Sequence, residues 1–227
     1  MTEREPLTAR RVIEAAASVA DRGGLAAVSM RNVGRELGVE AMSLYHHVAN
    51  KAALLDGLAD WVFGQFTPPP RDADWREAIA VRSASVRTVL TTHPWALGLV
   101  DSRANPGPGS LRHYDAVIGC LRRGGFSTAT AARAFSVIDA YVYGFALTER
   151  NLPFDAASGA NDFAAAITLP TDEYPHLAEL VSTVTATGDY SFAAEFDVGL
   201  DIILDGLGSL LADTDVRHRD ERRDPGH

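Results

Sequence analysis

Apolar side chains recur at intervals of three and four residues along most of the chain, which is the spacing of one face of an α-helix. No stretch shows the alternation of apolar and polar positions that predicts a β-strand, and no internal repeat is present. The sequence therefore predicts an all-α fold. We expect helices at about 9–22, 29–37, 39–48, 51–66, 75–92, 110–123, 127–151, 175–187 and 190–211, with short ones near 95–100 and 163–167.

Proline and glycine positions divide these helices into domains. Three consecutive prolines at 68–70 cannot lie inside a helix, so a linker is expected at 67–73. Residues 1–66 then form an N-terminal head with its connecting helix, and 74–214 form a helical C-terminal domain. The last residues, 215–227, are rich in charge and are expected to be a disordered tail.

Residues 29–51 predict two short helices joined by a tight turn. The Ser29 hydroxyl is suited to cap the first helix, and Gly38 ends it because glycine adopts the left-handed conformation without steric cost. Val39, Leu44 and Val48 then point inward from the second helix. Its outward residues, together with the first residue of the next helix, are Ala41, Met42, Ser43, Tyr45, His46, His47 and Lys51.

That outward face is suited to DNA. A short helix held across another at a fixed angle enters the major groove, which is roughly 12 Å wide. Small side chains at its start allow close approach to base edges, whereas Tyr45, His46, His47 and Lys51 are suited to phosphate oxygens. The spacing alone would equally fit a helical hairpin of an all-α protein without a nucleic-acid partner.

The segment LGVEAMSLYHHVANKAALLDGLA resembles the DNA-binding domain of the tetracycline-repressor (TetR) family, and the resemblance covers residues 8–66. The stretches WREAIAVRSASVRTVLTTHPW, GGFSTATAARAFSVIDAYVYGFAL and FDVGLDIILDGL resemble the C-terminal domain of the tetracycline-repressor subgroup. This resemblance implies a three-helix helix-turn-helix head, a connecting helix, and a C-terminal domain for ligand binding and dimerisation. It implies a homodimeric repressor that binds palindromic operator DNA and releases it when a small-molecule effector binds.

The resemblance also assigns DNA contacts. Arg31 stands where the tetracycline repressor uses an arginine to read guanine. Arginine is the commonest bidentate partner of guanine O6 and N7. A solvated surface arginine is the alternative. Tyr45, His47 and Lys51 match family contacts, but His46 replaces a tryptophan. Ala41 and Met42 replace glutamine and proline, which implies a different operator. The expected contact set is completed by Ser29 and Ser43.

In the C-terminal domain, resemblance and helical spacing together place five residues on the faces that line the family's pocket: Tyr114, Val117, Cys120, Phe135 and Asp139. Packing in the core is the alternative for each. The histidine, asparagine and glutamine that hold the drug–magnesium chelate in the tetracycline repressor are replaced here by Thr67, Arg82 and Val117. Tetracycline is therefore not the expected effector, and neither a metal nor a cofactor is expected.

Composition and charge qualify this reading. The chain is 46% hydrophobic and 22% charged, ordinary for a globular protein, but its net charge of −9 opposes binding to phosphates. Residues 1–66 hold seven Lys or Arg against eight Asp or Glu, so most of the excess negative charge lies outside the head. The alternative that this charge supports is an all-helical small-molecule-binding protein without effective DNA binding.

Other function classes find little support. No run of about 18 apolar residues and no signal peptide is seen, so we expect a cytoplasmic protein with no membrane partner. His93, His113, Asp139 and Glu149, with Cys120 or a serine, are the candidates for catalysis. No nucleophile elbow, phosphate-binding glycine loop or HExxH pair accompanies them, so we expect no enzyme activity.

Overall fold

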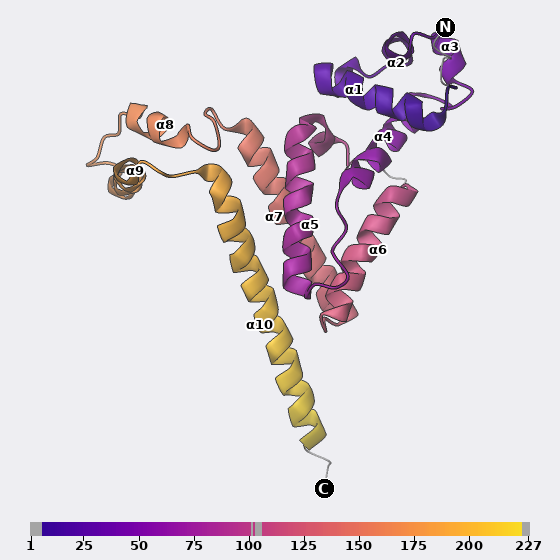
Figure 1. Ribbon diagram of the computed structural model, residues 1–227. Coiled ribbons are helices and arrows are strands. Elements are labelled where there is room, and N and C mark those ends of the chain that lie inside the picture. Colours follow the sequence, from indigo (N-terminus) through magenta and orange to yellow (C-terminus); the bar gives the residue numbers. More distant parts are fainter. Residues whose placement is uncertain (1–5, 101, 103–105, 224–227) are drawn as a thin grey trace. The chain divides into compact units, whose positions relative to one another are not determined.

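A computed structural model describes residues 6–100, 102 and 106–223, and these residues form helices α1 to α10, two 3-10 helices and connecting turns, with no strand (Figure 1). The predicted all-α fold is confirmed. The chain divides into two compact units, one ending at Ser136 and the other beginning at Val137.

The head contains α1 (Ala9–Ala27), α2 (Met30–Leu37) and α3 (Ala41–Leu44). The Thr8 side chain caps α1 by accepting a hydrogen bond from the Arg11 amide (3.2 Å). Gly24, with φ 68° and ψ 178°, interrupts the regular helix where the sequence predicted its end. The core of the head is made by fully buried apolar side chains, among them Val12, Ala16, Val28, Val33 and Leu44.

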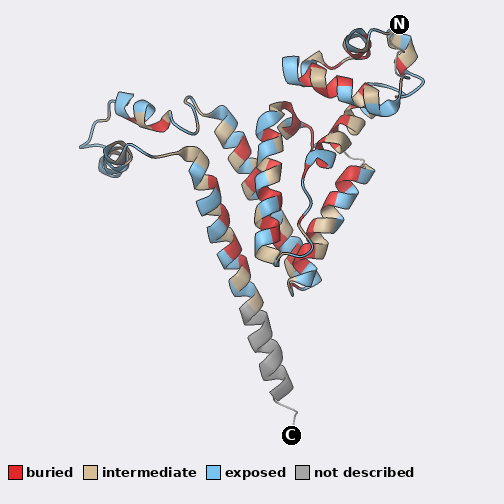
Figure 2. Cartoon of the chain, in the orientation of Figure 1, coloured by how far each residue is buried: buried red, intermediate tan, exposed pale blue. Residues whose placement is uncertain are grey.

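The connecting helix α4 (Lys51–Gln65) leads from the head into the rest of the first unit. Asn50 caps it by accepting from the Ala53 amide (2.9 Å). The unit continues with α5 (Trp75–Thr92), the 3-10 helix η1 (Pro94–Gly98), α6 (Pro108–Arg123) and the start of α7 (Thr128–Asn151). Figure 2 shows that buried positions repeat along one side of α5 and α6, the periodicity from which these helices were predicted.

The second unit contains the rest of α7, then α8 (Ala160–Ala166), α9 (Pro175–Thr187), η2 (Phe192–Ala194) and α10 (Glu195–Arg223). The Tyr141 hydroxyl donates to the carbonyl of Phe196 (2.8 Å), and the two rings stack with centroids 5.6 Å apart, so α7 and α10 are joined directly. The sequence predicted a disordered tail from residue 215, but the backbone of 215–223 continues helix α10. Residues 224–227 of the predicted tail lie outside the described residues.

Candidate DNA-binding surface and effector cavity

The turn between α2 and α3 has the geometry that the sequence predicted. The Ser29 hydroxyl accepts from the Asn32 amide (3.2 Å), and Gly38 adopts the left-handed conformation with φ 64°. Gly34 allows the two helices to meet closely, because a Cβ there would lie 2.9 Å from the Val39 carbonyl oxygen. The angle between α2 and α3 is thus fixed by two glycines, of which only Gly38 was singled out from the sequence.

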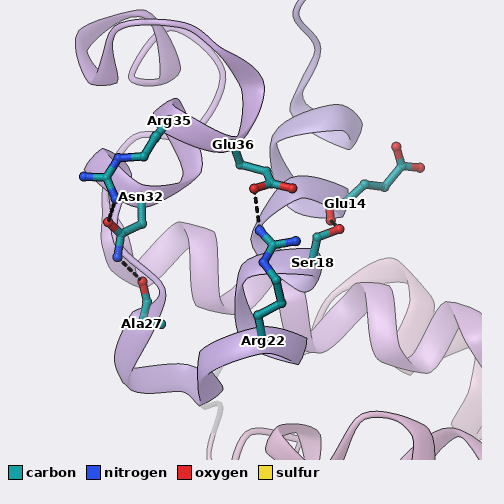
Figure 3. A network of polar contacts seen from close by, with 7 residues as sticks. All are labelled: Glu14, Ser18, Arg22, Ala27, Asn32, Arg35 and Glu36. Atoms are coloured by element: carbon teal, nitrogen blue, oxygen red, sulfur yellow. Dashed lines mark hydrogen bonds and ion pairs between the residues drawn. The ribbon is translucent and has the colours of Figure 1, made fainter.

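Polar contacts hold α2 against α1 (Figure 3). Arg22 of α1 forms an ion pair with Glu36 of α2. The side-chain Nδ2 of Asn32 donates to the Ala27 carbonyl (2.7 Å), and Arg35 donates to the side-chain oxygen of Asn32 (3.4 Å). The bond to Ala27 and the Arg22–Glu36 ion pair therefore join α2 to α1.

Helix α3 is shorter than the predicted span of 39–48. Regular helix covers only Ala41–Leu44, and the chain continues as turns in which the Tyr45 amide donates to Met42 and the His47 amide donates to Leu44. Bonds from residue i+3 to residue i tighten the backbone and replace the ordinary helical pattern there. Leu44 and Val48 are nevertheless buried, as expected.

The nine predicted DNA contacts lie together on the helix-turn-helix and at the start of α4. Met42 is 73% exposed and Tyr45 is 45% exposed, which is unusual for side chains of this size. Ala41, Ser43 and Ser29 are half-buried. The remaining members of the set are exposed: Arg31, His46, His47 and Lys51.

A cavity of about 650 Å³ lies between the end of α4, the proline linker and one face of α6. Its volume falls within the range of about 300–1,000 Å³ that is typical of small-molecule sites. The wall of the cavity is apolar near α4 and charged along α6. The residues that line it are Phe63, Gly64, Phe66, Pro68, Pro69, Pro70, Arg71, Gly109, Arg112, His113, Asp115, Ala116, Gly119 and Arg123.

A buried Arg–His pair lies behind this cavity. Arg82 of α5 is fully buried, and its Nε and Nη2 donate to Nε2 of His113 at 3.2 and 2.6 Å. Burial, and secondarily the Arg82 charge, lower the pKa of His113 to about 3. His113 is therefore neutral at pH 7, and because Nε2 accepts, Nδ1 carries the proton.

None of the five predicted pocket residues lines the large cavity. Val117 and Cys120 are buried and do not line it, and burial raises the pKa of the Cys120 thiol. Tyr114 lines a small cavity of about 30 Å³, and its ring lies 5.5 Å from that of Phe135. Asp139 is half-buried in the second unit. No single cavity among the described residues is lined by all five. Their role in effector binding stays a prediction.

The three residues that replace the drug-chelate ligands, Thr67, Arg82 and Val117, each have another structural role. The Thr67 amide donates to the Ser85 hydroxyl (2.8 Å), Arg82 bonds His113, and Val117 is fully buried. His93, a catalytic candidate, donates from Nδ1 to Asp21 (2.7 Å). Its partner is thus a carboxylate of α1.

Two features of this region were missed from the sequence. Asp60 of α4 accepts from the Gly109 amide (2.6 Å) and the Ser110 amide (3.1 Å), so it caps α6 from another helix. Arg112 and Arg123 lie one on each side of the cavity-lining stretch of α6. The spacing of 112, 116, 119 and 123 is helical, and this periodicity was the available signal for a second functional face.

A capped helix-turn-helix with an exposed polar face, continued by a connecting helix into a helical domain with a cavity, defines the class of helix-turn-helix transcriptional regulators. Residues 12–58 match the family model for bacterial regulatory proteins of the tetR family, and residues 67–211 match the tetracyclin repressor-like C-terminal domain. The chain belongs to the TetR family of transcriptional regulators.

Relatives and solved structures agree with this assignment. The chain is 33% identical over 220 residues to the HTH-type transcriptional repressor DrrR1 of Streptomyces coeruleorubidus, covering 91% of this chain and 79% of that protein. It is 29% identical to the class A tetracycline repressor protein from transposon 1721 in Escherichia coli, over 91% and 92% of the two chains. Apo ActR from Streptomyces coelicolor matches with a TM-score of 0.75 at 28% identity, over 92% and 98% of the two chains.

The described residues contain neither a helix that could cross a membrane nor a cluster that could hold a metal ion. No helix among them is long and apolar enough to cross a membrane. In the same part of the chain, no group of three or more His, Cys, Asp or Glu side chains is placed to hold a metal ion.

Proposed function

We propose that this protein is a homodimeric repressor that binds palindromic operator DNA through Arg31 and the α3 surface and releases it when a small molecule occupies the C-terminal domain. The observation that carries the proposal is the course of α4. Its first residue, Lys51, belongs to the DNA-contact set, and its last turn contributes Phe63 and Gly64 to the cavity. One rigid helix therefore joins the two sites.

The domain boundaries proposed are 1–66, 67–73 and 74–214. The Phe66 ring lies 5.1 Å from that of His113, so the end of α4 packs on the helix that lines the cavity. A ligand that displaces this contact alters the tilt of α4. Recognition helices of a dimer must lie about 34–36 Å apart, or a multiple of that distance, to reach successive major grooves, so a modest tilt abolishes simultaneous binding.

Exposed apolar side chains of the second unit support the dimer. On α7, Val137 and Leu147 are 48% and 47% exposed and lie on the same side as the exposed Ala140 and Gly144. On α10, the corresponding exposed apolar residues are Val198, Ile202 and Leu210. Two such stripes paired across a two-fold axis would form a four-helix bundle. A monomer in sedimentation at micromolar concentration would contradict this part of the proposal.

Ligand-bound relatives support effector control. ActR from Streptomyces coelicolor, solved in complex with actinorhodin, has a TM-score of 0.74 and 29% identity over 91% and 99% of the two chains. The experiment is to find which fragments of the source genome the purified protein retains and to map the protected bases. Wild type should protect two half-sites related by a dyad. An Arg31→Ala variant is the matched test of reading, and protection without dyad symmetry would contradict the dimeric operator.

The second candidate is an all-helical small-molecule-binding protein without effective DNA binding. The net charge of −9 favours it, because affinity for DNA depends on cationic contacts. Retention of operator DNA with a steep dependence on salt decides for the repressor. Absence of retention at low salt, with a folded dimer, decides for the alternative.

A further inference from the structure

The charged side chains of the large cavity are mostly of one sign. Arg71 comes from the linker, and Arg112 and Arg123 come from α6, whereas Asp115 is the one acidic residue among the lining residues. None of the three arginines forms a hydrogen bond or ion pair with another described residue. The cavity therefore holds guanidinium groups that the described chain does not neutralise.

The buried floor of the cavity adds to this preference. His113 is 5% exposed and lines the cavity, and its Nε2 accepts from the buried Arg82. Its Nδ1–H has no acceptor among the described residues, so it is available as a neutral donor. The positive charge of Arg82 lies directly behind this ring, in a place shielded from water, where electrostatic interactions are strong.

The other wall is apolar and suited to a ring. Phe63 and Phe66 face the cavity at the end of α4, and the proline linker follows them. Gly64 leaves space there, since a Cβ built on it meets no atom within 4 Å. Aromatic side chains bind flat ring systems by stacking or edge contacts.

We propose that this cavity binds an organic anion, in which an apolar ring system rests against Phe63 and Phe66 and a carboxylate or sulfonate is held by Arg112 and Arg123. A guanidinium group pairs with the two oxygens of a carboxylate, or with two of the three oxygens of a sulfonate, through two parallel hydrogen bonds. The assignment rests on the proposed function only in treating the anion as the effector. The ligand class itself follows from the lining residues.

The test uses two fluorescent probes that share one ring system. The anionic probe is 1-anilinonaphthalene-8-sulfonate, and the neutral probe is N-phenyl-1-naphthylamine, which lacks the sulfonate. The full-length protein is titrated with each, without DNA. We expect saturable binding of the anion at one site per chain, with an affinity that falls as salt rises. Equal affinity for the two probes would overturn the assignment, because the charge would then play no part.

Three variants test whether the cavity is the binding site of the probe. Arg112→Gln and Arg123→Gln should each raise the dissociation constant of the anion by about five- to tenfold and that of the neutral probe by less than about twofold. Arg133→Gln, an exposed arginine of α7 outside the cavity, is the control for net charge and should leave both constants unchanged. An effect of Arg133→Gln as large as that of the cavity variants would overturn the proposal.

Gly64→Leu tests the location independently of charge. The new side chain would fill the open space at the end of α4 and should abolish binding of both probes while the helical circular dichroism remains that of wild type. Undiminished anion binding in this variant would place the probe elsewhere and overturn the proposal. Because no DNA enters these titrations, failure to retain operator DNA would refute the repressor without touching this result.

Discussion

Removal of the Asp60 carboxylate tests whether α4 and α6 are mechanically joined. Asp60 accepts from the amides of Gly109 and Ser110, the second and third residues of α6, and Gly107, the residue before that helix, provides no side-chain cap. Loss of an N-cap costs about 0.5–2 kcal/mol, and the favourable interaction of a carboxylate with the helix N-terminus contributes about 0.3–1 kcal/mol. Asp60 is half-buried, so we expect Asp60→Ala to lower the free energy of unfolding by about 1–2 kcal/mol.

The assay combines urea unfolding with amide hydrogen exchange. Exchange of peptides that cover the start of α6 should accelerate by about tenfold for each 1.4 kcal/mol of local stability lost, while exchange in α1 stays unchanged. Asp60→Asn retains an acceptor oxygen without the charge and should lose less than about 1 kcal/mol. Asp72→Ala removes an exposed linker carboxylate and serves as the control.

Gly109→Ala should reproduce the effect from the other side of the contact. A Cβ at this position would lie 2.7 Å from the Asp60 carbonyl oxygen and 2.8 Å from its carboxylate oxygen, so α4 and α6 must separate. If Asp60→Ala and Gly109→Ala both leave the unfolding free energy and the exchange of α6 within about 0.3 kcal/mol of wild type, the cap does not join the two helices.

Three further outcomes are expected. Arg31→Ala should cost about 1–3 kcal/mol in operator binding and relax preference at one base pair per half-site, whereas Lys51→Ala should weaken binding to all sequences and reduce the salt slope by about one unit; equal effects on specific and random DNA would remove the assignment. Asp21→Ala removes the acceptor of Trp95 Nε1 (2.6 Å) and should destabilise the contact of α1 with η1 by about 1 kcal/mol, measured by urea unfolding followed through tryptophan fluorescence. The pKa of His113 is about 3 in the folded protein, so its contribution to the free energy of unfolding is present above pH 6.5 and is lost as the pH falls from 6.5 towards 3. His113→Gln should flatten that decline in stability by up to about 1.4 kcal/mol per pH unit. An unchanged dependence of stability on pH would contradict the burial argument.

The elements that the sequence predicted well are those determined by neighbouring residues. Ser29, Asn50 and Asp74 each accept from an amide two or three residues ahead, and Gly38 needs only its own conformational freedom to end α2. Such signals act within one turn of helix, so a single sequence contains them. The helix-turn-helix was recognisable for this reason, and the resemblance to TetR regulators then supplied the roles of its outward residues.

The contacts that the sequence did not predict join residues far apart in the chain. Asp60 and Gly109 are 49 positions apart, and Arg82 and His113 are 31 apart. Neither pair has a local signature, because an aspartate on a helix or an arginine at mid-helix is ordinarily a solvated residue. Arg82 was identified only as a replacement for a chelate ligand, yet its burial beside His113 shows that the position now serves a different polar contact.

Helix α6 shows why one amphipathic helix can conceal a second site. Val117 and Cys120 were assigned to a pocket by resemblance to the family and by helical spacing, and both side chains are buried. Arg112 and Arg123 lie on the outer face, whose polar character ordinarily indicates solvent. The linker crosses this face, with Pro69 buried, and together with these exposed side chains it lines a cavity. A run of prolines ordinarily marks a linker between domains, but here the three prolines form one wall of the cavity. The charges beside that wall, on Arg112 and Arg123, are those on which effector selection would depend.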